Sequence, residues 1–367
     1  AVADAYGFEV RTGTATFADD GTLSVDGQPL PAAAYLLATG AEPGYPDLPG
    51  LDQIDHLTST TAMEQDDLPE SLVIIGGGYV GMEQAQLFAG LGVTVTIVGN
   101  LAPGAEPEMR EVMRAAFARD GIRVIEHRAV AAEPATDSTA STSPAQDVTV
   151  VTASGMRVTA DRLLVASGRT PRTSALNLGA AGVKTDDRGF IVVDDHQRTA
   201  NPHVFAAGDV TGGPQYVYVA AAQGRVAAEN AFGAEETVNY AGLPAVMFTR
   251  PQLASAGLTE QQALDAGYDC ACRTLDLTDV PRALVNFDTL GAVKLVADAT
   301  TGRLLGVHAA ADAAGELMLA ATYAIKMGMT VHDMAATWAP YLTMSESLRL
   351  AAKLFEPGEQ LPTSCCA

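Results

Sequence analysis

The longest apolar runs of the chain predict a βαβ unit near its middle. Residues 71–100 read SLVIIGGGYVGMEQAQLFAGLGVTVTIVGN. An unbroken apolar run comes first, then a cluster of glycines, then apolar residues at helical spacing from about Tyr79 to Ala89, and finally a second β-branched run. An unbroken apolar run is typical of a strand that is buried on both faces of a parallel sheet. We therefore expect a parallel α/β domain here.

Alternating patterns and turn residues predict the other elements. Residues 8–38 alternate short apolar pieces with turns such as ADDGT, which predicts a small antiparallel meander leading into the strand YLLATG. The segment EPEMREVMRAAFARDG has acids in its first turn and ends at Gly121, so we expect a helix that feeds the strand IRVIE. Residues 131–147 are small and polar and are expected to form a surface loop. From about Ala241, the strands GAVKLVAD and RLLGVHAA with several helices predict a separate α+β domain.

Composition narrows the classes of partner. A chain of 367 residues with 48% hydrophobic residues can hold two or three domains with sizeable cores. The formal net charge of -22 disfavours nucleic acid and anionic membranes as partners, because both would repel the chain. No apolar run is long enough to span a membrane. The 4 cysteines do not form a disulfide framework, so we expect a reducing, cytoplasmic location.

The glycine cluster is a candidate dinucleotide site. Gly76, Gly78 and Gly81 form G-x-G-x-x-G between a strand and a helix, where the backbone must turn tightly and let a pyrophosphate approach the helix N-terminus. An acid at the end of the second strand usually binds the ribose 2′-hydroxyl of NAD, and an arginine there binds the 2′-phosphate of NADP. Here that strand ends at Gly99 and Asn100, with neither residue type. We favour NADPH and leave NADH open.

Three strands close on a short Ala/Gly sequence. They end in Ala38-Thr39-Gly40, Ala166-Ser167-Gly168 and Ala207-Gly208-Asp209. Glycine at such an end allows a ligand to come close, and a carboxylate such as that of Asp209 can accept hydrogen bonds from a hydroxyl. Taken alone, Asp209 could equally cap a local turn.

In this order, the motifs resemble those of the flavin-dependent pyridine nucleotide disulfide oxidoreductases, over residues 8–355. The resemblance implies an α/β fold with two Rossmann-like, three-layer ββα nucleotide-binding domains, an α+β dimerisation domain, a homodimer, and the cofactors FAD and NAD(P)H. The implied domains are a partial FAD domain at 1–70, the NAD(P)H domain at 71–168, the second FAD part at 169–240, the interface domain at 241–355 and a tail at 356–367. The implied cofactor contacts are Ala38, Thr39, Gly40, Gly76, Gly78, Tyr79, Val80, Gly81, Glu83, Gly168, Gly208, Asp209 and Val217.

Two elements of that family are absent from the printed sequence. They are the first G-x-G-x-x-G, for the ADP part of FAD, and the C-x-x-x-x-C redox pair, both of which lie upstream in relatives. We therefore expect the chain to be the later part of a longer enzyme.

The C-terminal segment indicates a branch of the family. Disulfide reductases carry His-Pro-Thr-x-x-Glu where this chain reads WAPYLTMSE, with Tyr341 five residues before Glu346. A phenol, with a pKa near 10, is a poor proton shuttle at pH 7. Together with PQYVYVAAAQG, VPRALVNFDT and the terminal SCCA, this segment resembles the mercuric reductase branch, in which Hg(II) is the substrate.

That resemblance implies further site residues. Cys365 and Cys366 would capture Hg(II), Tyr79 and Tyr341 would line the metal site, and Glu346 would belong to the catalytic set. Thiolates suit the task because Hg(II) is a soft ion, and stepwise thiolate exchange can hand it on. Tyr79 could instead gate the nicotinamide pocket, and Glu83 could be a solvated helix position rather than a residue facing the flavin.

Two alternative functions stay open. One is a disulfide reductase such as dihydrolipoyl dehydrogenase, which Tyr341 and the terminal cysteines argue against. The other is a non-catalytic, nucleotide-binding protein that captures metal. Cys270 and Cys272 lie on one face of a predicted strand and are expected to pack rather than to bind metal, and the histidines, including His308, are expected to be structural.

Overall fold

The computed structural model describes residues 5–135 and 147–356, and its contacts divide the chain into two compact units. The first unit comprises residues 1–45 and 168–239, and the second comprises residues 46–167 and 240–367. The finer domain boundaries expected from the sequence stay predictions. No helix among the described residues is long and apolar enough to cross a bilayer.

The first unit contains the predicted meander and two strand pairs. The meander is an antiparallel sheet of three short strands, as the sequence predicted. β4 pairs in parallel with β14, and β5 pairs antiparallel with β13, so segments far apart in sequence meet at the strand ends that carry the Ala/Gly sequences. The rings of Phe17 and Tyr35 contact each other edge to face, with 5.6 Å between their centroids, in the hydrophobic core of this unit. The elements are β1 (Ala15–Phe17), β2 (Leu23–Val25), β3 (Gln28–Pro29), β4 (Tyr35–Leu37), β5 (Ala41–Pro43), β13 (Arg169–Pro171), β14 (Val204–Ala206), the 3-10 turn η3 (Asp209–Thr211) and α4 (Val217–Ala231).

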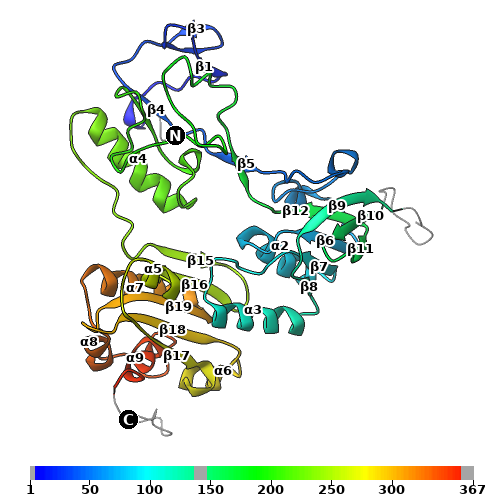
Figure 1. Cartoon of the computed structure of the whole chain (residues 1–367), viewed down its shortest axis with the longest axis vertical. Coiled ribbons are helices and arrows are strands. Elements are labelled where there is room, and N and C mark those ends of the chain that lie inside the picture. The colour runs from blue at the N-terminus through cyan, green and yellow to red at the C-terminus, as the bar shows by residue number, and fades with distance from the viewer. Residues whose placement is uncertain (1–4, 136–146, 357–367) are drawn as a thin grey trace. The chain divides into compact units, whose positions relative to one another are not determined.

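The second unit is built on the parallel sheet that the apolar runs predicted. Its strand order is β12-β6-β7-β8, and all neighbours are parallel. The helices α2 and α3 connect consecutive strands, which confirms the predicted βαβ unit (Figure 1). The elements are η1 (Leu51–Gln53), η2 (Thr61–Glu64), β6 (Ser71–Ile75), α2 (Tyr79–Gly90), β7 (Thr94–Val98), α3 (Pro107–Arg119), β8 (Arg123–Ile125) and β12 (Arg162–Val165).

This sheet is the middle of three layers. Along β6, Leu72 and Ile74 join the core formed with α2 and α3, whereas Val73 and Ile75 join a second core with β9 and β10. Because side chains alternate across a strand, both faces of β6 are covered, which is why its sequence is apolar without interruption. The covering layer is an antiparallel sheet in the order β11-β10-β9, formed by β9 (Ala129–Pro134), β10 (Val148–Thr152) and β11 (Arg157–Ala160).

The expectation of a loop over residues 131–147 was wrong at its start. Residues 129–134 form β9, which pairs with β10 along most of its length. The alanines and the proline of this segment are poor strand formers, so the sequence did not indicate a strand. In the structure, Ala129 and Ala132 are buried in the core that also contains residues of β10. Propensity was overridden here by packing.

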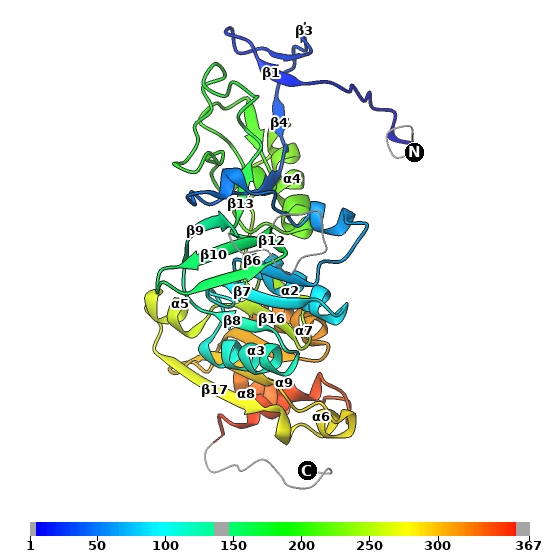
Figure 2. The ribbon, with the colours of Figure 1, turned by 90° about the vertical axis from the view of Figure 1, so that its right-hand side faces the viewer.

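The second unit also holds a five-stranded antiparallel sheet in the order β15-β16-β19-β18-β17. Its strands are labelled in Figure 1, and Figure 2 labels β16 and β17 with the flanking helices α5 to α9. One face packs against α7, α8 and α9 in the largest hydrophobic core of the described residues. The other face contributes Met247, Leu253 and Ala310 to the core of α2 and α3. The predicted α+β architecture after Ala241 is confirmed. The elements are β15 (Pro244–Met247), β16 (Gln252–Gly257), α5 (Glu260–Asp265), β17 (Cys270–Asp276), η4 (Leu277–Asp279), α6 (Pro281–Asn286), β18 (Ala292–Asp298), β19 (Leu304–Ala311), α7 (Ala314–Lys326), α8 (Val331–Ala336) and α9 (Glu346–Lys353).

Candidate functional site

Each glycine of the G-x-G-x-x-G turn has its own structural reason. Gly76 has φ of 116°, and a Cβ at this residue would collide with the carbonyl of Ala166. A Cβ on Gly81 would collide with the carbonyl of Gly76, so this glycine brings α2 close to the strand end. A Cβ on Gly78 would meet nothing within 4 Å. Gly76 and Gly81 are therefore required by packing, while Gly78 keeps open space at the start of α2.

The start of α2 suits a bound pyrophosphate. Gly78 is the N-cap of α2 and offers no side chain to cap it. The first N–H groups of a helix lack partners within the helix and carry positive potential. Open space at Gly78 together with an uncapped helix N-terminus is the arrangement that lets an anion approach the backbone. The residues present fit a dinucleotide.

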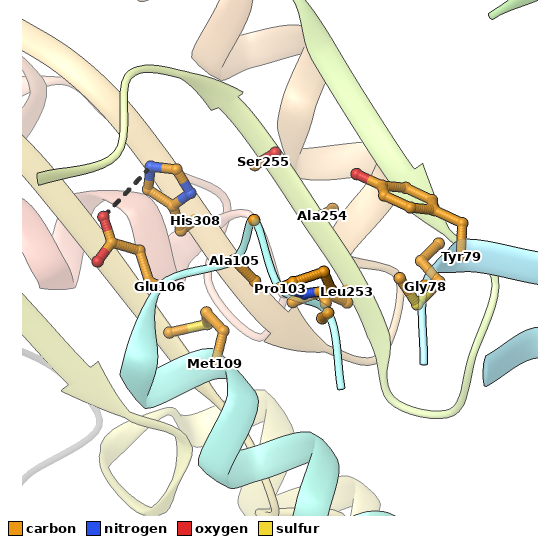
Figure 3. Close-up of a pocket in the computed structure, with 13 residues that line it drawn as sticks. Gly78, Tyr79, Pro103, Ala105, Glu106, Met109, Leu253, Ala254, Ser255 and His308 are labelled. Carbon is orange, nitrogen blue, oxygen red and sulfur yellow. Dashed lines mark ion pairs between the residues drawn. The ribbon is translucent and has the colours of Figure 1, made fainter. Parts of the chain in front are cut away.

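A cavity of about 170 Å³ lies beside this turn. Figure 3 shows Gly78 and Tyr79 on one side of it and Glu106 with His308 on the other. Its walls are mainly apolar, and its ionisable groups besides the Tyr79 phenol are Glu106 and His308. The lining residues are Gly78, Tyr79, Ala102, Pro103, Gly104, Ala105, Glu106, Met109, Met247, Leu253, Ala254, Ser255 and His308.

The loop between β7 and α3 forms part of this cavity and is held against the glycine turn. Ala102 N donates to the carbonyl of Gly77 at 2.7 Å, and a Cβ on Gly77 would collide with the carbonyl of Asn100. Leu101 is fully buried, whereas Asn100 is exposed. The loop is thus fixed at the end of the second strand, where a dinucleotide presents its adenosine ribose.

A buried ion-pair network, which we call the Lys294 network, fixes the far end of that loop. Lys294 on β18 is 2% exposed, and its Nζ donates to Glu106 at 2.9 Å, Glu108 at 2.9 Å and Glu260 at 2.8 Å. Glu106 is 3% exposed, and its other oxygen accepts a hydrogen bond from Glu260 N. The network joins the start of α3 to the five-stranded sheet and to α5.

The charges of the network are set by these contacts. Burial opposes the ammonium form of Lys294, but its bonds to three carboxylates outweigh burial and raise its pKa above the usual value. Lys294 holds the pKa of Glu260 below 4.5. His308 Nε2 lies 2.9 Å from the carbonyl of Leu258, so this nitrogen carries the ring proton. Burial lowers the pKa of His308 below 6.5, which leaves it neutral at pH 7 beside Glu106.

The sequence did not reveal this network. We expected His308 to be structural, and Lys294 received no role. A signal existed, because Lys294 interrupts the apolar strand GAVKLVAD, in which every position from Ala292 to Ala297 is buried. Its partners come from segments about 190 and 30 residues away, which no local pattern connects.

Glu83 and its neighbour Gln86 attach α2 to the segment after β15. Glu83 accepts a hydrogen bond from Phe248 N at 2.7 Å, and Gln86 both accepts from Arg250 N and donates to Arg250 O. Glu83 is therefore not simply solvated. Tyr79, the first residue of α2, is 43% exposed and lines the cavity.

The predicted flavin residues lie in the first unit. Asp209 begins η3 directly after β14, and its carboxylate lies 3.5 Å from Arg169 Nε. Gly40 and Gly208 have φ of 71° and 80°, which favours glycine at both strand ends. Thr39 follows the exposed Ala38 and donates its hydroxyl to the carbonyl of Arg172, so that bond must be kept or exchanged when a ligand binds. The exposed Val217, the first residue of α4, also belongs to this unit, as does Gly168, which the resemblance had assigned to the NAD(P)H nucleotide rather than to the flavin.

The partly exposed carboxylate of Asp209 fits a hydroxyl-bearing ligand. Its side chain is 26% exposed, and a Cβ on Gly40 would meet nothing within 4 Å. Because β4 and β14 are parallel, the carboxylate of Asp209 and the unobstructed backbone of Gly40 follow strand ends at the same edge of this strand pair. This arrangement fits the predicted contacts to FAD.

The C-terminal candidates are only partly described. Tyr341 is half exposed. Glu346 begins α9, is 8% exposed, and its Oε2 is buried without a hydrogen-bond partner among the described residues. Cys365 and Cys366 lie outside the described residues. Within residues 5–135 and 147–356, no three His, Cys, Asp or Glu side chains are grouped as a metal site.

Cys270 and Cys272 pack rather than form a site. Both lie on β17, and both contact the small core that contains Val296 and Leu305. Burial, followed by the charge of Glu260, raises the pKa of Cys272 to about 12. The thiol is therefore protonated at neutral pH.

Comparison with protein families assigns almost the whole chain. Residues 2–224 match the family model described as pyridine nucleotide-disulphide oxidoreductase, and residues 243–352 match the model of its dimerisation domain.

Characterised relatives extend the comparison. The chain is 50% identical to a mercuric reductase of Streptomyces lividans, over 99% of this chain and 77% of the relative. It is 44% identical to a mercuric reductase of Bacillus cereus, over 99% of this chain and 57% of the relative. The chain thus spans little more than half of one relative and about three quarters of the other.

Solved structures agree on the fold. The Cu(II) complex of the HOCl-induced flavoprotein disulfide reductase RclA from Escherichia coli superposes with a TM-score of 0.86, at 28% identity, over 97% of this chain and 81% of that one. LpdA from Mycobacterium tuberculosis gives a TM-score of 0.78 at 28% identity, over 95% of this chain and 75% of that one.

Proposed function

The chain belongs to the pyridine nucleotide-disulphide oxidoreductases, in the mercuric reductase branch, and we propose that the full-length enzyme reduces Hg(II) to Hg(0) with the electron pair of NAD(P)H. The observation that carries this proposal is 50% identity to a mercuric reductase across 99% of the chain. The glycine turn and the Asp209 strand end support it, because their geometry suits the two nucleotide cofactors of such an enzyme.

The residues of the chain divide the work between binding and orientation. The open backbone at Gly78 and the N-terminus of α2 would hold the pyrophosphate of NAD(P)H. Asp209 would accept a hydrogen bond from an FAD hydroxyl. FAD bound there would supply the redox chemistry that side chains lack, as the electron carrier between the nicotinamide and a cysteine pair.

Capture of the metal falls to the C-terminal thiols. Cys365 and Cys366 would bind Hg(II) as thiolates and pass it on by exchange, without release of the free ion. Tyr79 and Tyr341 would contact the ion in transit, and Glu346 would accept a hydrogen bond at its unpartnered oxygen. Two electrons from NAD(P)H reduce one Hg(II) to Hg(0), and NAD(P)⁺ and a proton are released.

The dimerisation domain at residues 243–352 supports a homodimer. Leu319 and Tyr323 on α7 and Met327, the residue after its last one, are spaced four residues apart, and each is more than half exposed. An apolar stripe of this kind on a helix is costly to leave in water. We propose that it packs against a second copy of the chain. We also propose that the enzyme is located in the cytoplasm.

A disulfide reductase is the second candidate, since the E. coli structural relative is described as one. Tyr341 stands where such enzymes carry a histidine that protonates the leaving thiolate, which argues against this activity here.

One assay separates these functions. The FAD-loaded full-length enzyme should oxidise NAD(P)H when Hg(II) is added in excess thiol, and volatile Hg(0) should form in equal amount. The variant with Cys365→Ala and Cys366→Ala should lose most turnover at low Hg(II), while a variant with Cys272→Ala, at the half-buried thiol of β17, should retain it. Efficient reduction of lipoamide with no response to Hg(II) would instead establish a disulfide reductase, and neither reaction would indicate metal capture alone.

A further inference from the structure

We propose that Gln223 is a positioning residue for FAD, because its buried amide holds the backbone of Gly208 and thereby sets the direction of Asp209. The inference rests on the proposed function only for the contact between Asp209 and FAD, and it does not depend on the metal substrate. Gln223 received no role from the sequence patterns or from the resemblance. The strand end that presents Asp209 is completed by a side chain from α4, a separate element of the same unit.

Gln223 lies on the buried face of α4. It is 2% exposed, and the residues that share this face are Val219, Val226, Ala227 and Asn230. Their spacing is that of one face of a helix. An amide buried among such residues is costly unless its polar atoms are hydrogen-bonded. Gln223 meets this requirement outside its own helix, because its Oε1 accepts a hydrogen bond from Gly208 N at 2.6 Å.

Gly208 needs such a contact because glycine does not fix its own backbone. Its φ of 80° and ψ of -159° lie in a region that is almost restricted to glycine. Glycine enters this region without strain, but it adopts many other conformations equally well. The residue type at position 208 therefore does not determine the direction in which Asp209 leaves β14.

Two contacts determine that direction. Gln223 holds the N–H of Gly208, and the carbonyl of Gly208 accepts hydrogen bonds from Thr211 Oγ1 at 2.9 Å and from Thr211 N at 3.0 Å. Because a peptide group is planar, these contacts fix the peptide planes on both sides of Gly208. The Thr211 contact is local to η3, whereas Gln223 ties the strand end to α4.

The packing around the amide of Gln223 leaves it little freedom. A Cβ on Gly208 would lie 3.2 Å from Ala220 Cβ, one turn before Gln223 on α4. A Cβ on Gly213 would lie 3.6 Å from Gln223 Nε2. The amide therefore lies beside both ends of the segment 208–213, which carries Asp209 near its start.

The expected consequence concerns the affinity for FAD. The side chain of Asp209 is 26% exposed, with Arg169 Nε at 3.5 Å, so its carboxylate is accessible to a hydroxyl. Without the Gln223 contact, the backbone of Gly208 would be free to adopt other conformations, and FAD binding would have to order it. Ordering a binding residue during association lowers affinity, whereas a preorganised residue avoids this loss. Gln223 thus acts through Asp209 and need not touch FAD.

The test measures FAD affinity on the full-length enzyme after removal of the flavin, by the change in flavin fluorescence, without nucleotide or Hg(II). Gln223→Met keeps much of the side-chain volume but removes the amide oxygen, and it should raise the dissociation constant of FAD about tenfold or more. An unchanged dissociation constant in this variant would overturn the inference.

Asn230→Leu is the matched control. Asn230 is a buried amide two turns farther along α4, and it bonds the backbone of His196 and Glu236. Its replacement should also destabilise the fold in urea, but it should change the dissociation constant of FAD by less than about threefold. Equal losses of FAD affinity in Gln223→Met and Asn230→Leu would indicate a merely structural role and refute the proposal.

Gln223→Glu provides a second variant with the acceptor retained. At pH 5.5 burial keeps the new carboxyl protonated, and its carbonyl oxygen can accept from Gly208 N as the amide does. FAD affinity should then lie within about threefold of that of the wild type at the same pH. A loss as large as that of Gln223→Met would contradict the role of the amide oxygen.

A double-mutant cycle with Asp209→Ala tests whether Gln223 acts through Asp209. In the Asp209→Ala background, Gln223→Met should weaken FAD binding by no more than about twofold, because the residue that it positions is gone. A loss of about tenfold in both backgrounds would show that Gln223 acts separately from Asp209, against the proposal. If Asp209→Ala bound FAD as tightly as the wild type, the inference and the FAD contact of Asp209 would both be wrong. Hg(II) reduction would be unaffected by that result, since the assay contains neither nucleotide nor metal.

Discussion

Replacing Lys294 with methionine should strongly destabilise the protein, and the structure allows the size of the effect to be worked out. Methionine fills most of the same volume, so the cost comes from charge rather than from a cavity. Of the three carboxylates left behind, Glu108 and Glu260 are more than 40% exposed and can be hydrated, whereas Glu106 is 3% exposed. The penalty is therefore that of one buried carboxylate without its partner, about 3–5 kcal/mol in the free energy of unfolding.

The assay is urea denaturation at pH 7, followed by circular dichroism, on the wild type, on Lys294→Met and on the control Lys184→Met, whose side chain is exposed in the first unit. The control should change the free energy of unfolding by no more than about 0.5 kcal/mol. Adding Glu106→Gln to Lys294→Met should recover more than half of the loss, because the amide is neutral and its oxygen can still accept from Glu260 N. A loss below about 1 kcal/mol, or a double variant no more stable than the single one, would refute the reasoning.

Three further outcomes are expected. Gly78→Ala should fold normally but bind the dinucleotide at least tenfold more weakly. The control Gly90→Ala, at the other end of the same helix and equally free of contacts, should leave binding unchanged. Equal affinities of the two variants in calorimetry would contradict the role of Gly78. The bond to Lys294 lowers the pKa of Glu260, so the ionised Glu260 stabilises the fold above pH 4.5, and this stabilisation is lost as the pH falls through the lower pKa of the folded state. The difference in unfolding free energy between wild type and Glu260→Gln should therefore shrink toward pH 3. A difference that stays constant with pH would contradict this prediction. With its pKa near 12, Cys272 should be alkylated by iodoacetamide at pH 8 at least tenfold more slowly than a free thiol, as read by mass spectrometry, and faster in Glu260→Gln; rapid labelling in the wild type would exclude the raised pKa.

Sequence reasoning succeeded where the signal is local. The unbroken apolar run of β6 and the glycines after it fix a strand, a turn and a helix within about twenty residues, because burial on both faces and close backbone packing each demand particular residue types. The antiparallel meander and the strands β18 and β19 were predicted for the same reason.

Sequence reasoning failed where distant segments decide the outcome. β9 is a strand because β10 covers its alanines, and Lys294 is tolerated in a buried strand because α3 and α5 bring three carboxylates to it. Neither the pairing of β9 with β10 nor the carboxylate partners of Lys294 can be recognised from the residues of a single element. The roles of Cys365 and Cys366 rest on resemblance and stay predictions, since these residues lie outside the described part of the chain.

The Lys294 network also limits how freely parts of this enzyme can be exchanged with those of relatives. A chimera that imports another protein's segment 71–168 would present a foreign α3 to Lys294, and a first turn without acids at positions 106 and 108 would leave the ammonium buried beside Glu260 alone. Exchange of nucleotide specificity by grafting therefore requires that these two acids be carried over with the loop, or that Lys294 be replaced in the same step. The start of α3 and the five-stranded sheet that carries Lys294 must therefore be exchanged together, rather than the nucleotide-binding segment alone.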